Sequence, residues 1–387
     1  MLHRRYIIGM MLAGTLMLTS CTEEEAGMNP GSLDAVPIAF ECTATEIPDS
    51  GPPGATRTAN GYTGNITTTN NNLRYTGFGM FAAHASGVKP DLMFNQQVEY
   101  VFPASGAGAG YWTYSPLKYW PADPVGTCFY AYAPYVDEPS GLASGTTGII
   151  GMSNNNSTSA PYIIYARARH PEENVDLLWY YKQVAADDAL LTDGRPNTGK
   201  AIPVRLQHAL ARVKVSLGVT NATTLDAGDK LLVRRVTFTG SIAQEGKLNL
   251  ASTGTTPTWY DQYTQSTTIF IDCTPEANPD SYGIITEEAR YIRDLPYSWQ
   301  PSGLPHTNYD AGNAATKTNL LCMGDAPSYL YLIPQSSLTL SCVLDYCIIA
   351  ADGTVTEDSR PQDNPYSFNI TPLNGNTTYD LTLKITI

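Results

Sequence analysis

The stretch ARVKVSLGV, residues 211–219, decides the fold class of this chain. Apolar and polar side chains alternate along it, and the apolar positions are Ala211, Val213, Val215, Leu217 and Val219. Successive side chains of a β-strand point to opposite faces of the sheet, so this period of two predicts a half-buried strand. Helical periodicity is nearly absent from the rest of the chain.

The same alternation recurs in three other segments: AVPIAFECTA (35–44), LTLSCVLDY (338–346) and YDLTLKITI (379–387). In the first segment the apolar face consists of Val36, Ile38, Phe40 and Cys42. In the last segment it consists of Tyr379, Leu381, Leu383, Ile385 and Ile387. Many such strands, separated by turns rich in Gly, Pro and Asn, predict an all-β sandwich.

The composition favours β-structure and argues against some classes of function. Tyrosine (25) and glycine (32) are abundant while charged residues make up 15%, and pleated sheets favour aromatic side chains. The formal net charge is −13 without any cluster of lysine or arginine, so we expect no nucleic-acid partner. The five histidines are scattered and no nucleophile motif is present. We therefore expect no enzyme activity, no cofactor, and neither a catalytic nor a metal site.

The N-terminus has the features of an export signal. Arg4 and Arg5 precede an apolar run over residues 6–20, which is shorter than the roughly 20 residues of a membrane-spanning helix. The sequence Leu-Thr-Ser-Cys ending at Cys21 resembles the bacterial lipobox, whose cysteine becomes the acylated first residue of the mature protein. We predict a signal peptide over residues 1–20, signal cleavage and lipidation (palmitate) at Cys21, and an acidic tether over 21–34. The alternative is an ordinary signal peptide with a chance cysteine.

Turn-forming residues gather in TDGRPNTGKAIP, residues 192–203, as is typical of a domain junction. We therefore predict an N-terminal domain over 35–203 and a C-terminal domain over 204–387. Polar stretches at 48–74 and 138–160 predict loops. Cys342 and Cys347 lie too far apart along one strand to form a disulfide with each other, and the state of the six cysteines other than Cys21 stays open.

Several motifs in this order resemble the fimbrillin family of the Bacteroidota. They are VPIAF followed by ATRTA, KYWP, CFYAYAPY, DLLWYY, VRLQHALARVKV and the terminal NTTYDLTLKITI. The resemblance implies an exported lipoprotein with two transthyretin-like β-sandwich domains in tandem. It also implies a structural subunit, stalk or tip, of a cell-surface pilus (fimbrium) that serves cell adhesion. The three glutamates after Cys21 resemble the export signal of surface-exposed lipoproteins, so we expect display on the outer membrane; a merely solvated acidic linker is the alternative.

The resemblance further implies how such a subunit assembles with other pilus subunits. A protease cuts between Arg57 and Thr58, in a Gly/Pro/Thr-rich segment, and removes the first strand (Val36, Ile38, Phe40, Cys42). The C-terminal strand of another subunit (Tyr379 to Ile387) then fills the groove by strand exchange. Three alternatives stay open: Arg57 is not processed, 379–387 pairs permanently within its own domain as in a pilus anchor, or the rings near Tyr111 bind glycans of a host or bacterial surface.

Overall fold

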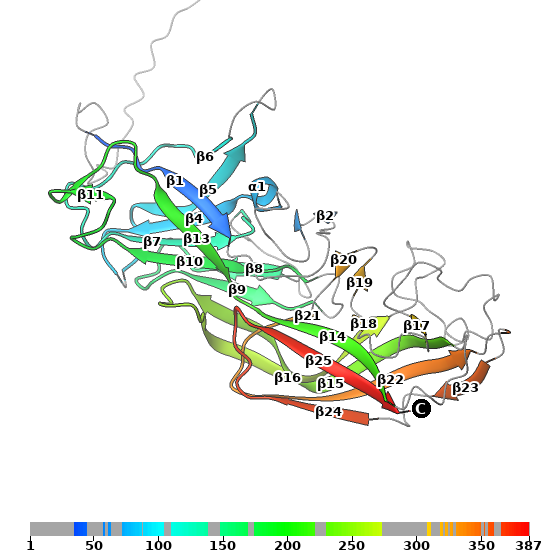
Figure 1. The fold of residues 1–387 in the computed structure, drawn as a ribbon. Helices are drawn as coiled ribbons and strands as arrows, with labels where there is room; N and C mark the ends of the chain where they lie inside the picture. The colour runs from blue at the N-terminus through cyan, green and yellow to red at the C-terminus, as the bar shows by residue number, and fades with distance from the viewer. Residues whose placement is uncertain are drawn as a thin grey trace, which may run out of the picture.

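A computed structural model describes residues 35–44, 57–58, 61–62, 72–86, 88–103, 110–137, 148–168, 174–220, 230–272, 308–310, 318–319, 322–323, 326–327, 330–349, 352, 355–359 and 365–386. Within these ranges the chain is all-β, and its one helix is the short α1 (Asn72–Thr76) (Figure 1). The all-β prediction is therefore confirmed. Cys21, the three glutamates and Ile387 lie outside the described residues.

The first sheet has seven strands in the order β1-β13-β10-β7-β4-β5-β6. Their bounds are β1 (Phe40–Ala44), β13 (Ile202–His208), β10 (Leu178–Gln183), β7 (Cys128–Ala133), β4 (Phe78–Ala83), β5 (Met93–Val101) and β6 (Tyr111–Thr113). Every residue of β4 and β7 is buried, because both faces of this sheet are covered. The first strand of the chain, β1, lies at one end of the sheet beside β13 (Figure 1).

The second sheet has eight strands built around the long β15. Their bounds are β15 (Lys230–Asn249), β22 (Leu338–Ile349), β23 (Val355–Ser359), β9 (Tyr162–Ala166), β8 (Gly148–Met152), β16 (Thr258–Asp272), β17 (Asn308–Asp310) and β24 (Pro365–Ile370). A third sheet packs against it and comprises β18 (Thr318–Asn319), β14 (Ala211–Thr220), β21 (Leu330–Leu332) and β25 (Thr378–Thr386). Two-residue strands form three small ladders: β2 (Arg57–Thr58) with β3 (Gly61–Tyr62), β11 (Leu191–Thr192) with β12 (Arg195–Pro196), and β19 (Cys322–Met323) with β20 (Ala326–Pro327).

Three apolar cores join these sheets. The N-terminal core lies on the β1 side of the first sheet and includes Phe78, Phe129 and Leu206. The C-terminal core lies between β14 and the second sheet and includes Val213 and Leu340. The middle core joins the two halves; it contains Phe81, Tyr130, Trp179, Leu248, Tyr331 and Ile333.

Strand pairing crosses the predicted domain boundary. The hairpin of β8 and β9 comes from the first half of the chain, yet β9 pairs antiparallel with β15. Residue 203 lies inside β13, and the chain passes from the first sheet to the third at 209–210. The turn-rich stretch 192–203 contains most of the β11–β12 hairpin and continues into the start of β13.

Two further expectations need correction. The polar stretch 138–160 contains β8, and the stretch 48–74 contains the start of α1 as well as β2 and β3. Arg212, on the polar side of the 211–219 alternation, is only 1% exposed, so the far face of β14 is covered at this point. The alternation itself is confirmed, because Ala211, Val213 and Val215 are fully buried in the C-terminal core.

Candidate assembly interface

β1, the first of the described strands, packs one apolar face into the N-terminal core. β1 pairs parallel with β13, with Phe40 opposite Ile202 and Ala44 opposite Leu206. Ile38, Phe40, Cys42 and Ala44 are each at most 8% exposed, whereas Glu41 and Thr43 between them are exposed. The predicted apolar face is therefore confirmed at Ile38, Phe40 and Cys42, and Val36 packs against the same core while partly buried.

A second contact holds the residues just before β1. Ile38 N–H donates to the Lys118 carbonyl (2.9 Å), and Trp120 N–H donates to the Val36 carbonyl (3.0 Å). The Tyr114 hydroxyl donates to the Ile38 carbonyl at 2.8 Å, and burial raises the pKa of Tyr114 to about 12. The segment from Val36 to Ala44 is thus bonded on one side to 118–120 and on the other to β13.

Phe40 is the main anchor of this segment. Its ring centroid lies 5.4 Å from that of Tyr114 and 6.2 Å from those of Phe78 and Phe129. Aromatic pairs at such separations add to the stability that burial of the ring provides. Cys42 follows on the same face, and burial raises the pKa of its thiol well above the usual value. A protonated, buried thiol is unreactive, so Cys42 is protected while β1 stays in place.

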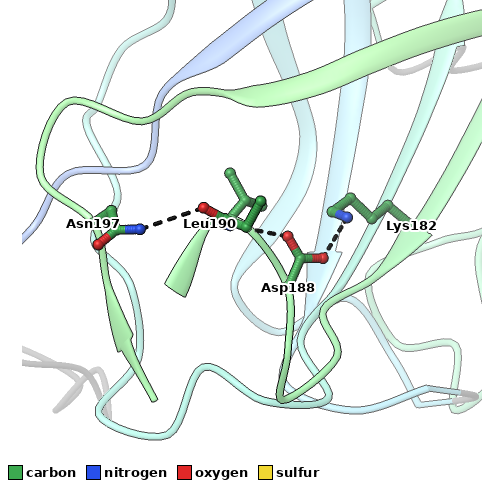
Figure 2. A network of polar contacts seen from close by, with 5 residues as sticks. Lys182, Asp188, Leu190 and Asn197 are labelled. Atoms are coloured by element: carbon green, nitrogen blue, oxygen red, sulfur yellow. Dashed lines mark hydrogen bonds and ion pairs between the residues drawn. The ribbon is translucent and has the colours of Figure 1, made fainter. Parts of the chain in front are cut away.

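A polar network holds the connection that precedes β13 (Figure 2). The Asp188 carboxylate accepts a hydrogen bond from the Leu190 N–H (3.0 Å) and pairs with the Lys182 ammonium. Asn197 donates from its side chain to the Ala189 carbonyl and from its backbone to the Leu190 carbonyl. These bonds fix the β11–β12 hairpin, and Leu190 and Leu191 then pack into the N-terminal core beneath β1.

The C-terminal strand is paired within its own chain. β25 runs parallel to β14 with nine residue pairs, from Arg212 opposite Thr378 to Thr220 opposite Thr386. Leu381 is 6% exposed in the C-terminal core, and Tyr379 packs against that core while partly buried. Leu383 and Ile385 lie in the strand at alternate positions, and their side chains are not described. In this structure, 379–386 is thus a strand of its own sheet.

Arg57 and Thr58 form β2, which pairs with Gly61 and Tyr62 of β3 in a short hairpin. The predicted cleavage point thus lies in a turn-bearing segment between β1 and α1. Sequence reasoning missed the partners that hold β1: Tyr114, the 118–120 segment and β13. The signal for β13 was available, since Ile202, Val204 and Leu206 alternate with polar residues and all three are buried.

The rings considered as a glycan platform are mostly part of the cores. Tyr114, Trp120, Tyr130 and Tyr132 are buried, and of the nine aromatic rings between residues 111 and 135 only Tyr111 is exposed, at 61%. His208 ends β13, and its Nδ1 lies 2.7 Å from the Asp176 carboxylate with both side chains fully buried. Within the described ranges, no three His, Cys, Asp or Glu side chains gather where a metal ion could bind. A helix of the length and apolarity that a membrane crossing needs is likewise absent from these ranges.

The model of the family described as fimbrillin-like matches residues 65–386. The chain belongs to the fimbrillin-like family. The match extends from the residues just before α1 to the end of β25, so it includes all three cores except β1 itself. The family resemblance noted in the sequence is thereby confirmed.

One curated protein and one solved structure are similar to this member of the family. The fimbrium subunit Fim1C of Phocaeicola vulgatus is 28% identical over 166 residues, which cover 40% of this chain and 37% of that subunit. The chain therefore matches well under half of that relative's length. A solved structure of a fimbrial protein from Bacteroides vulgatus has a TM-score of 0.49 at 19% identity, and the alignment covers 90% of this chain and 95% of that one.

Proposed function

We propose that this protein is a structural subunit of a cell-surface pilus, assembled when another strand replaces β1. The observation that carries the proposal is the pairing of β1: a strand at the N-terminal end of the described chain fills the edge of the N-terminal core. Only this segment lies on the N-terminal side of Arg57 among the described strands, so a cut there frees no other strand. Two transthyretin-like sandwiches, sharing the middle core, are the domain organisation that we propose.

Removing β1 would leave an incomplete sheet. The edge of β13 from Ile202 to Leu206 would lose its backbone partners, and the sites of Ile38 and Phe40 would open. Burial of these two side chains alone is worth about 3–6 kcal/mol. A cut at Arg57 breaks the chain but not these contacts, so the fragment should stay bound until a competing strand displaces it. Open sheet edges and apolar grooves are what extended strands bind.

The proposed competitor is the C-terminal strand of a neighbouring subunit. Its residues Tyr379, Leu381, Leu383 and Ile385 have the same alternation as the face of β1. β1 pairs parallel with β13, and β25 pairs parallel with β14. An incoming strand that pairs parallel with β13 would therefore use an orientation that already occurs twice in this fold. A donor must first leave its own sheet, at the cost of exposing Leu381.

The position of β25 favours a second candidate: an anchor or tip subunit that accepts a strand and donates none. Nine paired residues and the burial of Leu381 hold β25 in its own sheet. In both cases we propose export as a lipoprotein acylated at Cys21, with the acidic residues after it directing display at the outer surface. Adhesion to host or bacterial surfaces would then follow from the pilus as a whole.

The test is limited trypsin cleavage followed by displacement. Cutting after Arg57 should leave the N-terminal fragment bound, and a peptide of residues 377–387 should displace it. The same peptide with Leu381→Asp and Leu383→Asp is the matched control and should not. Arg57→Ala should abolish the cut. Size-exclusion chromatography then separates the candidates: oligomers after the cut indicate a polymerising subunit, and monomers that still bind the peptide indicate an anchor or tip. A cut protein that neither loses its fragment nor binds the peptide would contradict strand exchange.

A further inference from the structure

The strand β16 has a long edge on the second sheet with which no other described strand pairs. It has fifteen residues and pairs with β15, and its other edge has no strand partner among the described residues. From Thr264 to Asp272 its register with β15 is regular, because the two register shifts lie beyond Ala243 on β15. Tyr263 to Ser266 are exposed, and Tyr263 reaches 57%. An open edge of this kind offers unpaired N–H and C=O groups to another strand.

The other sheet edges among the described strands are short, carry charge or begin at proline, and β8, which has neither charge nor proline, has only five residues and a register shift in its pairing with β9. β6 has three residues, β24 begins at Pro365, and β23 carries Glu357 and Asp358. β25 carries Asp380 and Lys384, and β1 has only five residues with Glu41 among them. Short length, proline and charge are the usual means by which proteins protect their edges. In β16 the charged residues lie near the two ends, at Asp261 and Asp272, and the ten residues between them, from Gln262 to Ile271, include no charged residue and no proline.

We propose that β16 pairs antiparallel with β16 of a second copy of this chain, about a twofold axis beside Ser266. A twofold axis normal to the sheet places side chains of the same face opposite each other. Thr264 of each copy would then face Thr268 of the other, and Ser266 would face its own equivalent. Such Thr and Ser pairs across antiparallel strands are stabilising, and one already occurs here: the hydroxyls of Thr268 and Thr239 lie 3.4 Å apart. The edge is therefore complementary to itself, as a twofold interface requires.

Charge also favours a second copy over a partner with a charged strand. The chain carries a net charge of −13, so most surfaces of two copies repel each other. Between Gln262 and Ile271 no like charges would meet, and Asp261 at one end is paired with Lys247 at 2.9 Å. A single strand pair buries less than the roughly 1,200 Å² of a stable complex, so we expect a weak dimer with a Kd of about 10–100 µM. Subunits confined to one surface or one filament can make such a contact laterally.

Sedimentation equilibrium of the uncut protein, lacking only the predicted signal peptide, tests this pairing from about 1 to 200 µM. β1 stays in place in this protein, so the result does not depend on strand exchange. We expect a monomer that dimerises with concentration. Ser266→Lys and Ser266→Glu each place like charges opposite one another and should weaken the dimer at least tenfold. An equimolar mixture of the two variants should dimerise again, which also shows that both are folded.

Cysteine cross-linking locates the contact. Ser266→Cys should form an intermolecular disulfide under mild oxidation, because its equivalent lies directly opposite. Thr239→Cys is the matched control: Thr239 is also exposed, but it lies on β15, one strand away from the edge. A protein that stays monomeric throughout, or a dimer that Ser266→Lys leaves unchanged, would overturn the proposal. So would cross-linking of Ser266→Cys no faster than that of Thr239→Cys.

Discussion

Replacing Phe40 with alanine tests whether side-chain packing holds β1 in place. Phe40 is 5% exposed and contacts three aromatic rings, so the change removes a large buried side chain from the N-terminal core. Substitutions of this kind cost about 3–5 kcal/mol. If β1 detaches while the rest of the sheet stays folded, the whole cost is subtracted from the free energy needed to detach β1. The fraction of molecules with β1 released should then rise by about 100- to 3,000-fold, at 1.4 kcal/mol for each factor of ten.

Alkylation of Cys42 measures this opening directly. Cys42 lies two residues from Phe40 on the same buried face and is 5% exposed, so a thiol reagent reaches it only when β1 leaves. Cys342 lies on β22 in the C-terminal core and reports unfolding of the other half of the molecule. Mass spectrometry can measure the rate of labelling at each thiol. Phe40→Ala should increase the labelling rate of Cys42 and leave the labelling rate of Cys342 unchanged. Glu41→Ala is the control, because Glu41 is the exposed neighbour on the same strand.

Two outcomes would refute this reasoning. Equal acceleration at Cys42 and Cys342 would mean that β1 leaves only when the whole molecule unfolds, and a removable strand would then be excluded. Unchanged labelling at both thiols would mean that backbone pairing with β13, rather than Phe40, holds the strand.

Two other predictions concern single cysteines. Cys21→Ala should abolish acylation, and metabolic labelling with a clickable fatty acid that still marks the variant would contradict the predicted anchor. Burial raises the pKa of Cys342 to about 12 from a usual value of 9.0, so between these values the unfolded chain loses this proton first. The free energy of unfolding should therefore fall as pH rises from about 9, by at most about 1.4 kcal/mol per pH unit for this group. Urea denaturation between about pH 8.5 and 10.5 should show a shallower decline for Cys342→Ala; equal slopes would mean that the thiol does not contribute.

Alternation along the chain was sufficient to predict which faces of β1 and β14 are buried. A period of two depends only on neighbouring residues, so the buried faces of β1 and β14 followed from Phe40, Cys42, Val213 and Val215. The all-β class followed in the same way, whereas the family came from the resemblance of several motifs in a fixed order, which the matching family model confirms.

Which strands lie side by side was decided by the tertiary structure. No local pattern links β1 to β13, more than 150 residues away, or the β8–β9 hairpin to β15 across the predicted boundary. Burial at Arg212 and the exposed edge of β16 also depend on what packs nearby, because the sequence shows the period of a strand but not its neighbours. Sequence thus determined the faces of the strands, whereas long-range packing decided which face is covered and which edge stays open.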